Sequence, residues 1–233
     1  MALQTRLTQI PEILLDLLFP SKCIGCGAEG EFICSSCSEE LPRLESPYCE
    51  SCGLPLEEEG ACPKCCNRPL EIDGIRSLFL HENLARDAVH ALKYNNLKSL
   101  AKPLAQLMAE YLESNPLPAD ILLAIPMHSK RMRKRGYNQA HLLAEELGRL
   151  MQLPVSRGTL IRTTDTPSQV SLGAEERRKN VAGAFHCKNQ AFADKRMLLI
   201  DDVCTTGATL NACAITLKEA GAASVWGLTL SRE

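Results

Sequence analysis

Two adjacent carboxylates, Asp201 and Asp202, follow four apolar residues at positions 197–200. A run of small residues comes directly after them, before a helical pattern begins: Cys204, Thr205, Thr206, Gly207, Ala208 and Thr209. Where a strand runs into such a loop at a helix N-terminus, backbone N–H groups and the helix dipole point toward an anion. Carboxylates beside that loop suit sugar hydroxyls or Mg²⁺. The pattern therefore predicts a ligand that carries a phosphate and a hydroxyl-bearing group.

A second candidate site is the basic stretch at 130–135, which follows a predicted strand and precedes a predicted helix. Arg side chains bind phosphate oxygens through two parallel hydrogen bonds, so a pyrophosphate group is a natural occupant. The candidate ligands are Lys130, Arg131 and Arg135. A solvated basic turn is the alternative interpretation.

A third stretch, residues 163–183, is long, polar and only weakly periodic. Long segments of this kind inside a compact domain often close over a binding site. Arg177, Arg178 and Lys179 would then bring positive charge to the ligand, and Arg177 and Lys179 join the two carboxylates as candidate catalytic residues. The alternative is a surface insertion with no role at the site.

The cysteines predict metal sites. Nine of the twelve fall between positions 23 and 66, and eight of these form four Cys-x-x-Cys pairs: Cys23/Cys26, Cys34/Cys37, Cys49/Cys52 and Cys62/Cys65. This spacing lets both thiolates of a turn reach one tetrahedral ion at about 2.3 Å. Four pairs predict two structural zinc sites of four cysteines each, and a disulfide scaffold is the weaker alternative. We favour pairing in sequence order over interleaved pairing, and Cys65 over the adjacent Cys66 as the last ligand.

The elements that must position these residues follow from apolar periodicity. Strands are expected at 75–81, 121–125, 197–200 and 224–230, and helices at 84–94, 97–113, 137–151 and 208–220. This alternation predicts an α/β fold, a mostly parallel sheet flanked by helices, whose ligands bind beyond the carboxyl ends of the strands. We expect an amphipathic helix at 1–20, a double zinc ribbon with four cysteines per site at 21–70, and the α/β domain at 74–233.

Charge and hydropathy narrow the class of protein. The net charge of −2 gives the whole chain no strong attraction to nucleic acid. Residues 1–70 carry 5 Lys/Arg and 11 Asp/Glu, and the remainder carries 21 and 17, so the α/β part suits an anionic ligand better. The longest apolar stretch, at 10–19, is too short to span a membrane and contains charged residues. We therefore expect a cytoplasmic protein without membrane insertion.

The strand, acids and loop at 197–210 resemble the motif with which type I phosphoribosyltransferases bind 5-phosphoribosyl-1-pyrophosphate (PRPP). The resemblance implies the type I phosphoribosyltransferase fold, with Asp201 and Asp202 on the ribose hydroxyls and the loop on the 5′-phosphate. It also implies that the basic stretch holds the pyrophosphate and that Mg²⁺ arrives with PRPP. The reaction open to such an enzyme is displacement of pyrophosphate from C1 of PRPP.

Over essentially its whole length the chain also resembles the ComF family (ComFC/GntX-like proteins). The residues that carry this resemblance are the apolar segment ending at Phe19-Pro20, the double zinc ribbon, the stretch Arg135-Gly136-Tyr137-Asn138-Gln139, and the PRPP motif. The family implies a PRPP-binding, phosphoribosyltransferase-like protein linked to DNA uptake in natural competence. The alternative is a non-catalytic competence factor that binds single-stranded DNA or a DNA-uptake helicase, with the PRPP fold as a sensor or scaffold.

Overall fold

The computed structural model describes residues 20–164, 183–188 and 192–233. The expected N-terminal helix and most of the expected closing segment, including Arg177 and Lys179, therefore lie outside the described residues. The chain divides into two compact units, residues 1–40 and 41–233. The division falls inside the double zinc ribbon, so that one group of four paired cysteines belongs to each unit.

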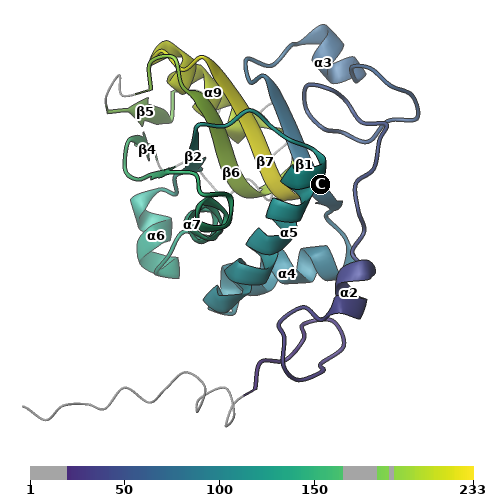
Figure 1. Cartoon of the computed structure of the whole chain (residues 1–233). Helices are drawn as coiled ribbons and strands as arrows, with labels where there is room; N and C mark the ends of the chain where they lie inside the picture. The colour runs from purple at the N-terminus through teal and green to yellow at the C-terminus, as the bar shows by residue number, and fades with distance from the viewer. Residues whose placement is uncertain (1–19, 165–182, 189–191) are drawn as a thin grey trace, which may run out of the picture. The chain divides into compact units, whose positions relative to one another are not determined.

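The larger unit is built on a five-stranded sheet with the order β1-β7-β6-β2-β3 (Figure 1). Its strands are β1 (Gly74–Leu80), β2 (Ile121–Ala124), β3 (Val155–Ser156), β6 (Arg196–Cys204) and β7 (Ser224–Arg232). Every neighbouring pair is parallel. The predicted parallel α/β sheet is confirmed.

Strand β6 is longer than expected. The sequence predicted that it ends at Ile200, before the acids, but pairing with β7 continues from Asp201↔Thr229 to Cys204↔Arg232. The two carboxylates therefore lie within the strand, on opposite faces of the sheet, because successive side chains of a strand alternate.

Helices flank both faces of this sheet. In Figure 1, α5 (Ala101–Ser114) and α7 (Gln139–Met151) lie in front of the strands and α9 (Ala208–Glu219) lies behind them. Met197 and Leu199 of β6 join the hydrophobic core on the α9 side. On the other side, α7 approaches the sheet so closely at Gly148 that a Cβ there would lie 2.5 Å from a Val155 methyl group. Burial of alternate strand residues on two helical layers thus fixes the register of the strands.

Five further elements connect these strands and helices. Helix α4 (Asn83–Tyr94) follows β1, and the 3-10 turn η1 (Lys98–Leu100) leads into α5. Helix α6 (Ser129–Arg135) follows β2, in the basic stretch for which the sequence predicted no helix. Strands β4 (Leu160–Arg162) and β5 (Phe185–Cys187), which were not predicted, form a separate antiparallel pair.

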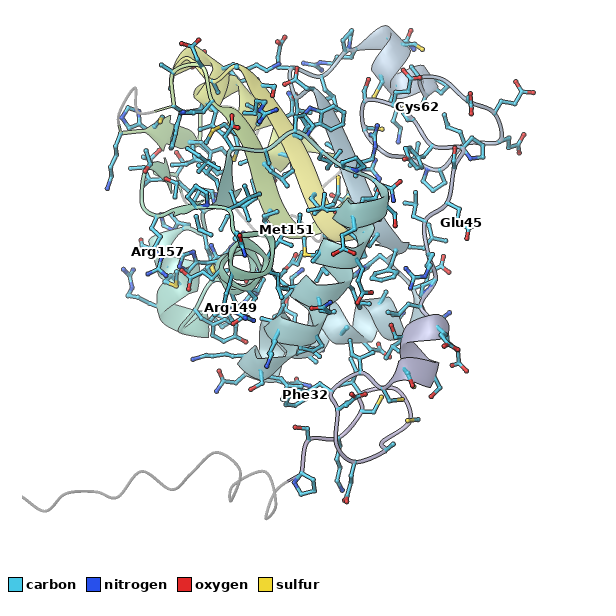
Figure 2. The ribbon with its side chains drawn as sticks, viewed as in Figure 1. Phe32, Glu45, Cys62, Arg149, Met151 and Arg157 are labelled. Carbon is cyan, nitrogen blue, oxygen red and sulfur yellow. The ribbon has the colours of Figure 1, made fainter. Side chains whose placement is uncertain are left out.

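Each zinc-ribbon segment contains one short helix, α2 (Ser35–Glu39) or α3 (Pro63–Asn67). The two segments repeat one local design. In each, the third cysteine is the residue just before the helix and the fourth lies within it; Cys62, before α3, is labelled in Figure 2. In each segment the backbone N–H of the third cysteine donates to Sγ of the first cysteine. The distances are 3.4 Å from Cys34 to Cys23 and 3.3 Å from Cys62 to Cys49.

Candidate functional site

A cavity of about 910 Å³ lies where the parallel strands end. It is lined by residues at or just beyond the ends of four strands: His81 after β1, Ile125 and Pro126 after β2, Asp201 to Thr205 from β6, and Glu233 after β7. Residues of α4, α6 and the start of α9 complete the wall. This is the edge of a parallel sheet at which α/β proteins bind ligands.

The small-residue loop lines this cavity throughout, from Cys204 to Thr209. Gly207 precedes the first residue of α9 and has a φ of 72°, a left-handed conformation that glycine adopts at little cost. A Cβ at this position would lie 2.9 Å from the Ile75 side chain, so space also selects glycine. The loop thereby turns the N-terminus of α9 toward the cavity, and the Ala208 N–H there donates to Thr206 Oγ1 at 3.3 Å.

The acid pair is held asymmetrically. Asp202 is 3% exposed, and its Oδ1 lies 2.9 Å from Nζ of Lys93 on α4. Its Oδ2 is buried and has no hydrogen-bond partner among the residues that the structure describes. Burial opposes the positive charge of Lys93, but the carboxylate of Asp202 outweighs this and raises the Lys93 pKa. Asp202 therefore presents one paired oxygen and one oxygen available to a donor on a ligand.

The neighbouring Asp201 behaves differently. Burial and the negative charge of Asp202 raise the pKa of Asp201 to about 7. Its Oδ1 accepts a hydrogen bond from the Asp202 backbone N–H at 2.9 Å, which opposes the rise. Asp201 therefore changes its charge near neutral pH.

The basic stretch is only partly at the cavity. Arg131, Lys134 and Arg135 line it, whereas Lys130 is exposed and is not among the lining residues. Arg135 donates to Oε1 of Gln139, and its guanidinium lies 5.3 Å from the centre of the Tyr94 ring. Gly136, with a φ of 82°, caps the C-terminal end of α6. This helix, rather than a turn, places basic side chains on the cavity at its start and its end.

Sequence reasoning missed Lys93, His81, Arg162 and Glu233, all of which line the cavity. None of them lies in a recognisable motif. His81 and Glu233 come directly after β1 and β7, so the strand ends could have suggested them. Lys93 lies in the last turn of α4, where a basic residue is ordinary, and only the fold brings it to Asp202.

Only the described ends of the expected closing segment can be placed. The backbone N–H of Thr163 donates to Ala184 O at 2.9 Å, next to the β4–β5 pair. Arg162 lines the cavity, and its guanidinium lies 5.5 Å from the centre of the Phe185 ring. The two ends of the segment thus lie next to each other, near the cavity.

The cysteines form two clusters in sequence order, Cys23/Cys26/Cys34/Cys37 and Cys49/Cys52/Cys62/Cys65, and within each cluster all Sγ atoms lie within 4.8 Å of one another. The distances Cys26–Cys34 and Cys52–Cys62 are 3.6 and 3.8 Å between Sγ atoms. A tetrahedral zinc with bonds of about 2.3 Å separates its sulfurs by roughly 3.8 Å, so these sulfurs fit zinc. The prediction of two four-cysteine sites paired in sequence order is confirmed. Cys66 instead contacts Ala61 O.

Comparison with known proteins agrees with this arrangement. Residues 14–66 match the family model "Double zinc ribbon domain". Competence protein F of Haemophilus influenzae is 30% identical over 226 residues, which cover 90% of this chain and 97% of that protein. This chain belongs to the competence protein F (ComF) family. The predicted family resemblance is therefore confirmed.

Other relatives of this ComF-family chain carry related names. DNA utilization protein YhgH of Escherichia coli K12 is 30% identical over 83% of this chain and 87% of that protein. Competence protein ComFC of Bacillus subtilis is 29% identical over 87% of this chain and 85% of that protein. Among the described residues of the ComF-family chain, no helix is both long enough and apolar enough to cross a membrane.

Solved phosphoribosyltransferases resemble the ComF-family chain more distantly. The purine phosphoribosyltransferase of Pyrococcus horikoshii is 15% identical over 56% of this chain and 80% of that protein, with a TM-score of 0.33. The adenine phosphoribosyltransferase of Leishmania tarentolae is 17% identical over 58% and 71%, with a TM-score of 0.33. These scores are low, so the strand order and register, and not these neighbours, define the fold.

Proposed function

We propose that this ComF-family protein binds PRPP in the cavity at the strand ends. The observation that carries the proposal is the buried Asp202 Oδ2, which has no partner among the described residues and lies in the same cavity as the loop before α9. A buried carboxylate oxygen without a donor is costly, and a ribose hydroxyl would supply the missing hydrogen bond. The loop before α9 would take the 5′-phosphate, since it offers N–H groups at a helix N-terminus.

The basic side chains would bind the pyrophosphate, which is the third part of PRPP after the ribose and the 5′-phosphate. Arg131, Lys134 and Arg135 line the cavity and suit the pyrophosphate group, whose charge they would offset. Of the three basic residues first expected there, Lys130 has the weakest claim because it is exposed and outside the lining. Arg177 and Lys179 stay candidates for the same group.

Magnesium fits this site only as an ion that PRPP brings with it. Mg²⁺ prefers oxygen ligands in an octahedral arrangement and keeps several waters. Of the two carboxylates, Asp202 already has one oxygen paired with Lys93, so the protein offers few free oxygens of its own. When bound, the ion would neutralise pyrophosphate charge, while Asp201 and Asp202 would hold ribose hydroxyls.

The names of the relatives give the biological setting. Since they include competence proteins and a DNA utilization protein, we propose a role in DNA uptake for this chain too. The reaction class open to a PRPP cavity is transfer of the phosphoribosyl group. The bond from C1 to the pyrophosphate oxygen breaks, its electron pair leaves with pyrophosphate, and an acceptor lone pair forms the new bond to C1.

Calorimetric titration of Mg²⁺ and PRPP into the wild-type protein and Asp202→Asn tests the binding proposal. Removing a charged acceptor costs about 1.5–3 kcal/mol, which corresponds to roughly 10- to 150-fold weaker binding. Glu219→Gln, at the other end of α9 and outside the cavity, removes one negative charge and should leave binding unchanged. No binding by the wild-type protein would refute the PRPP proposal, and equal affinities for wild type and Asp202→Asn would refute the role of Asp202.

A second function, binding of single-stranded DNA, is favoured by one observation. Tyr94 lines the cavity, is 62% exposed, and lies 4.7 Å from the His90 ring between ring centroids. Together with Arg135 it offers an aromatic face and a cation, which is how proteins hold single-stranded nucleic acid. Tyr137 cannot serve in this way, because it is 7% exposed and its hydroxyl donates to Leu92 O.

Fluorescence anisotropy with a labelled oligonucleotide tests this second function. Tyr94→Ala should weaken binding by about 1–3 kcal/mol per stacked base, which corresponds to roughly 5- to 150-fold, and affinity should fall as salt rises. Tyr111→Ala, an aromatic change outside the cavity, is the control. If Tyr94→Ala binds the oligonucleotide as tightly as the wild-type protein, the stacking role is wrong.

A further inference from the structure

The ribbon segment that carries Cys49, Cys52, Cys62 and Cys65, here called the second zinc ribbon, lies along β1, an edge strand of the sheet. The backbone N–H of Ile75 donates to Ser51 O at 3.0 Å, that of Leu80 to Pro42 O at 2.8 Å, and that of Leu44 to Leu78 O at 2.8 Å. An uncovered edge strand leaves such groups unpaired. The ribbon segment thus takes the hydrogen bonds that another strand would take, and Figure 2 shows Cys62 beside this edge.

The contact is close at the turn that holds the metal ligands. Gly53, directly after Cys52, has a φ of 67°, and a Cβ there would lie 2.6 Å from Ile75 O. Arg76 reaches back to the ribbon, where its guanidinium donates to Glu50 O at 2.8 Å and lies 4.9 Å from the centre of the Tyr48 ring. The turn around Cys49 and Cys52 is therefore fixed against β1 from both sides.

The chain that leaves this ribbon is attached to the start of α9. The side-chain oxygen of Asn211, in the first turn of α9, accepts the N–H groups of Glu71 and Ile72 at 2.7 and 3.1 Å. Leu70 packs against both the Cys49–Cys65 cluster and the core on the α9 side. The nearest Leu70 methyl group would lie 3.9 Å from a Cβ at Gly207. The second zinc ribbon and the small-residue loop at 204–209, here called the phosphate loop, thus share one packed boundary.

Ile75 of β1 lies between the same two places. Its carbonyl oxygen would lie 2.6 Å from a Cβ at Gly53, in the metal-binding turn, and its Cδ1 would lie 2.9 Å from a Cβ at Gly207, in the phosphate loop. The loop is also held from β7, where the buried Arg232, the last residue of that strand, donates from Nη1 to Sγ of Cys204 at 2.6 Å.

We propose that the second zinc site supports the phosphate loop through Ile75, Leu70 and Asn211, so that anion binding at the loop depends on zinc at Cys49/Cys52/Cys62/Cys65. The first site, Cys23/Cys26/Cys34/Cys37, belongs to the other compact unit and has no such role. Leu70 is a positioning residue in this arrangement. The proposal deepens the proposed PRPP function and rests on it for the ligand, but its effect on the loop is measurable without PRPP.

The test compares Cys62→Ser with Cys34→Ser in the full-length chain. The two variants are matched, because each removes the third cysteine of its site and places serine, a good N-cap, before a short helix. Elemental analysis should give about two zinc per wild-type chain and about one in each variant. Hydrogen–deuterium exchange of residues 204–211 should become at least about tenfold faster in Cys62→Ser and stay unchanged in Cys34→Ser, because opening a loop that loses about 1.4 kcal/mol of support becomes tenfold easier.

PRPP titration is the second measurement. Cys62→Ser should bind PRPP at least about tenfold more weakly than Cys34→Ser, which should match the wild-type protein. If Cys62→Ser does not fold, as judged by far-UV circular dichroism, Leu70→Ala decides, because it removes the side chain that packs on both the cysteine cluster and the core beside the loop. This variant should retain two zinc ions yet show fast exchange at 204–211 and weak PRPP binding.

The outcomes separate the two proposals. Slow exchange at 204–211 in both Cys62→Ser and Leu70→Ala, or equal acceleration in Cys34→Ser and Cys62→Ser, would overturn the supporting role. Fast exchange only in the second-site variants, in a protein whose wild-type form binds no PRPP, would uphold the supporting role and refute the PRPP function.

Discussion

Replacing Lys93 with methionine removes the positive charge that pairs with the buried acid Asp202. Methionine keeps most of the length and volume of the side chain, so packing at the end of α4 is largely preserved. The Lys93 and Asp202 side chains are 21% and 5% exposed, and the charged atoms are 2.9 Å apart. Removing one partner from a buried pair costs about 3–5 kcal/mol, because the other charge is left without a partner. The partial exposure of Lys93 places the expected loss at the lower end, near 3 kcal/mol.

For a protein of this size, that loss lowers the midpoint of thermal unfolding by roughly 6–12 °C. Differential scanning calorimetry at pH 7.5 measures it, with Lys102→Met, on the exposed face of α5, as the control for loss of a lysine charge. The double variant Lys93→Met/Asp202→Asn should recover much of the loss, since it no longer buries an unpaired charge. A midpoint for Lys93→Met within 1–2 °C of the wild-type value, or a double variant whose losses simply add, would refute this account of the pair.

Three further predictions follow from the cavity. Burial and the charge of Asp202 raise the pKa of Asp201 to about 7, so the stability that its protonated form contributes is present below about pH 4 and lost as the pH rises to 7. In Asp201→Asn the free energy of unfolding, measured with urea, should therefore depend less on pH across this window, and the same pH dependence as in the wild-type protein would contradict the shift. Gly207→Ala should destabilise the protein by more than the roughly 1–2 kcal/mol of left-handed backbone strain, because the new Cβ would also clash with Ile75. Gly158 has a similar φ of 69°, and a Cβ there would meet nothing within 4 Å, so Gly158→Ala should cost the strain alone. Equal losses of stability in thermal unfolding would rule out the clash at Gly207. Arg135→Ala should weaken PRPP binding about tenfold or more, and Lys130→Ala clearly less; the reverse order in calorimetry would place the pyrophosphate away from the cavity.

The sequence predicted the features that are encoded locally. Paired cysteines, alternating strands and helices, and the acids followed by a small-residue loop each lie within a short stretch, so their spacing alone indicates what they form. Tertiary pairing changed the details. Strand β6 extends through Cys204 because β7 continues beside it to Arg232, and no local pattern around the acids indicates this length.

The partners of the site residues could not be predicted for the same reason. Lys93 and Asp202 are distant in sequence and come together only because β1 and β6 flank β7 in one sheet, which brings the end of α4 to the end of β6. The basic stretch was recognised, but its helical form decides which of its side chains line the cavity. Residue types therefore indicated a chemistry for the site, which stays a prediction, and the strand order decided which residues line the cavity.

The two ribbons show how context separates segments of the same local design. Gly27 and Gly53 each follow the second cysteine of a pair and have φ values of 76° and 67°, so both turns require a residue that tolerates the left-handed conformation. A Cβ at Gly27 would meet nothing within 4 Å, whereas one at Gly53 would lie 2.6 Å from Ile75 O. The turn conformation alone therefore requires glycine at position 27, whereas at position 53 the close approach of β1 requires it as well. The side chain of Ile75, on the same strand, packs against Gly207. A structural change in the turn that holds Cys49 and Cys52 would therefore reach the phosphate loop through a single residue of β1.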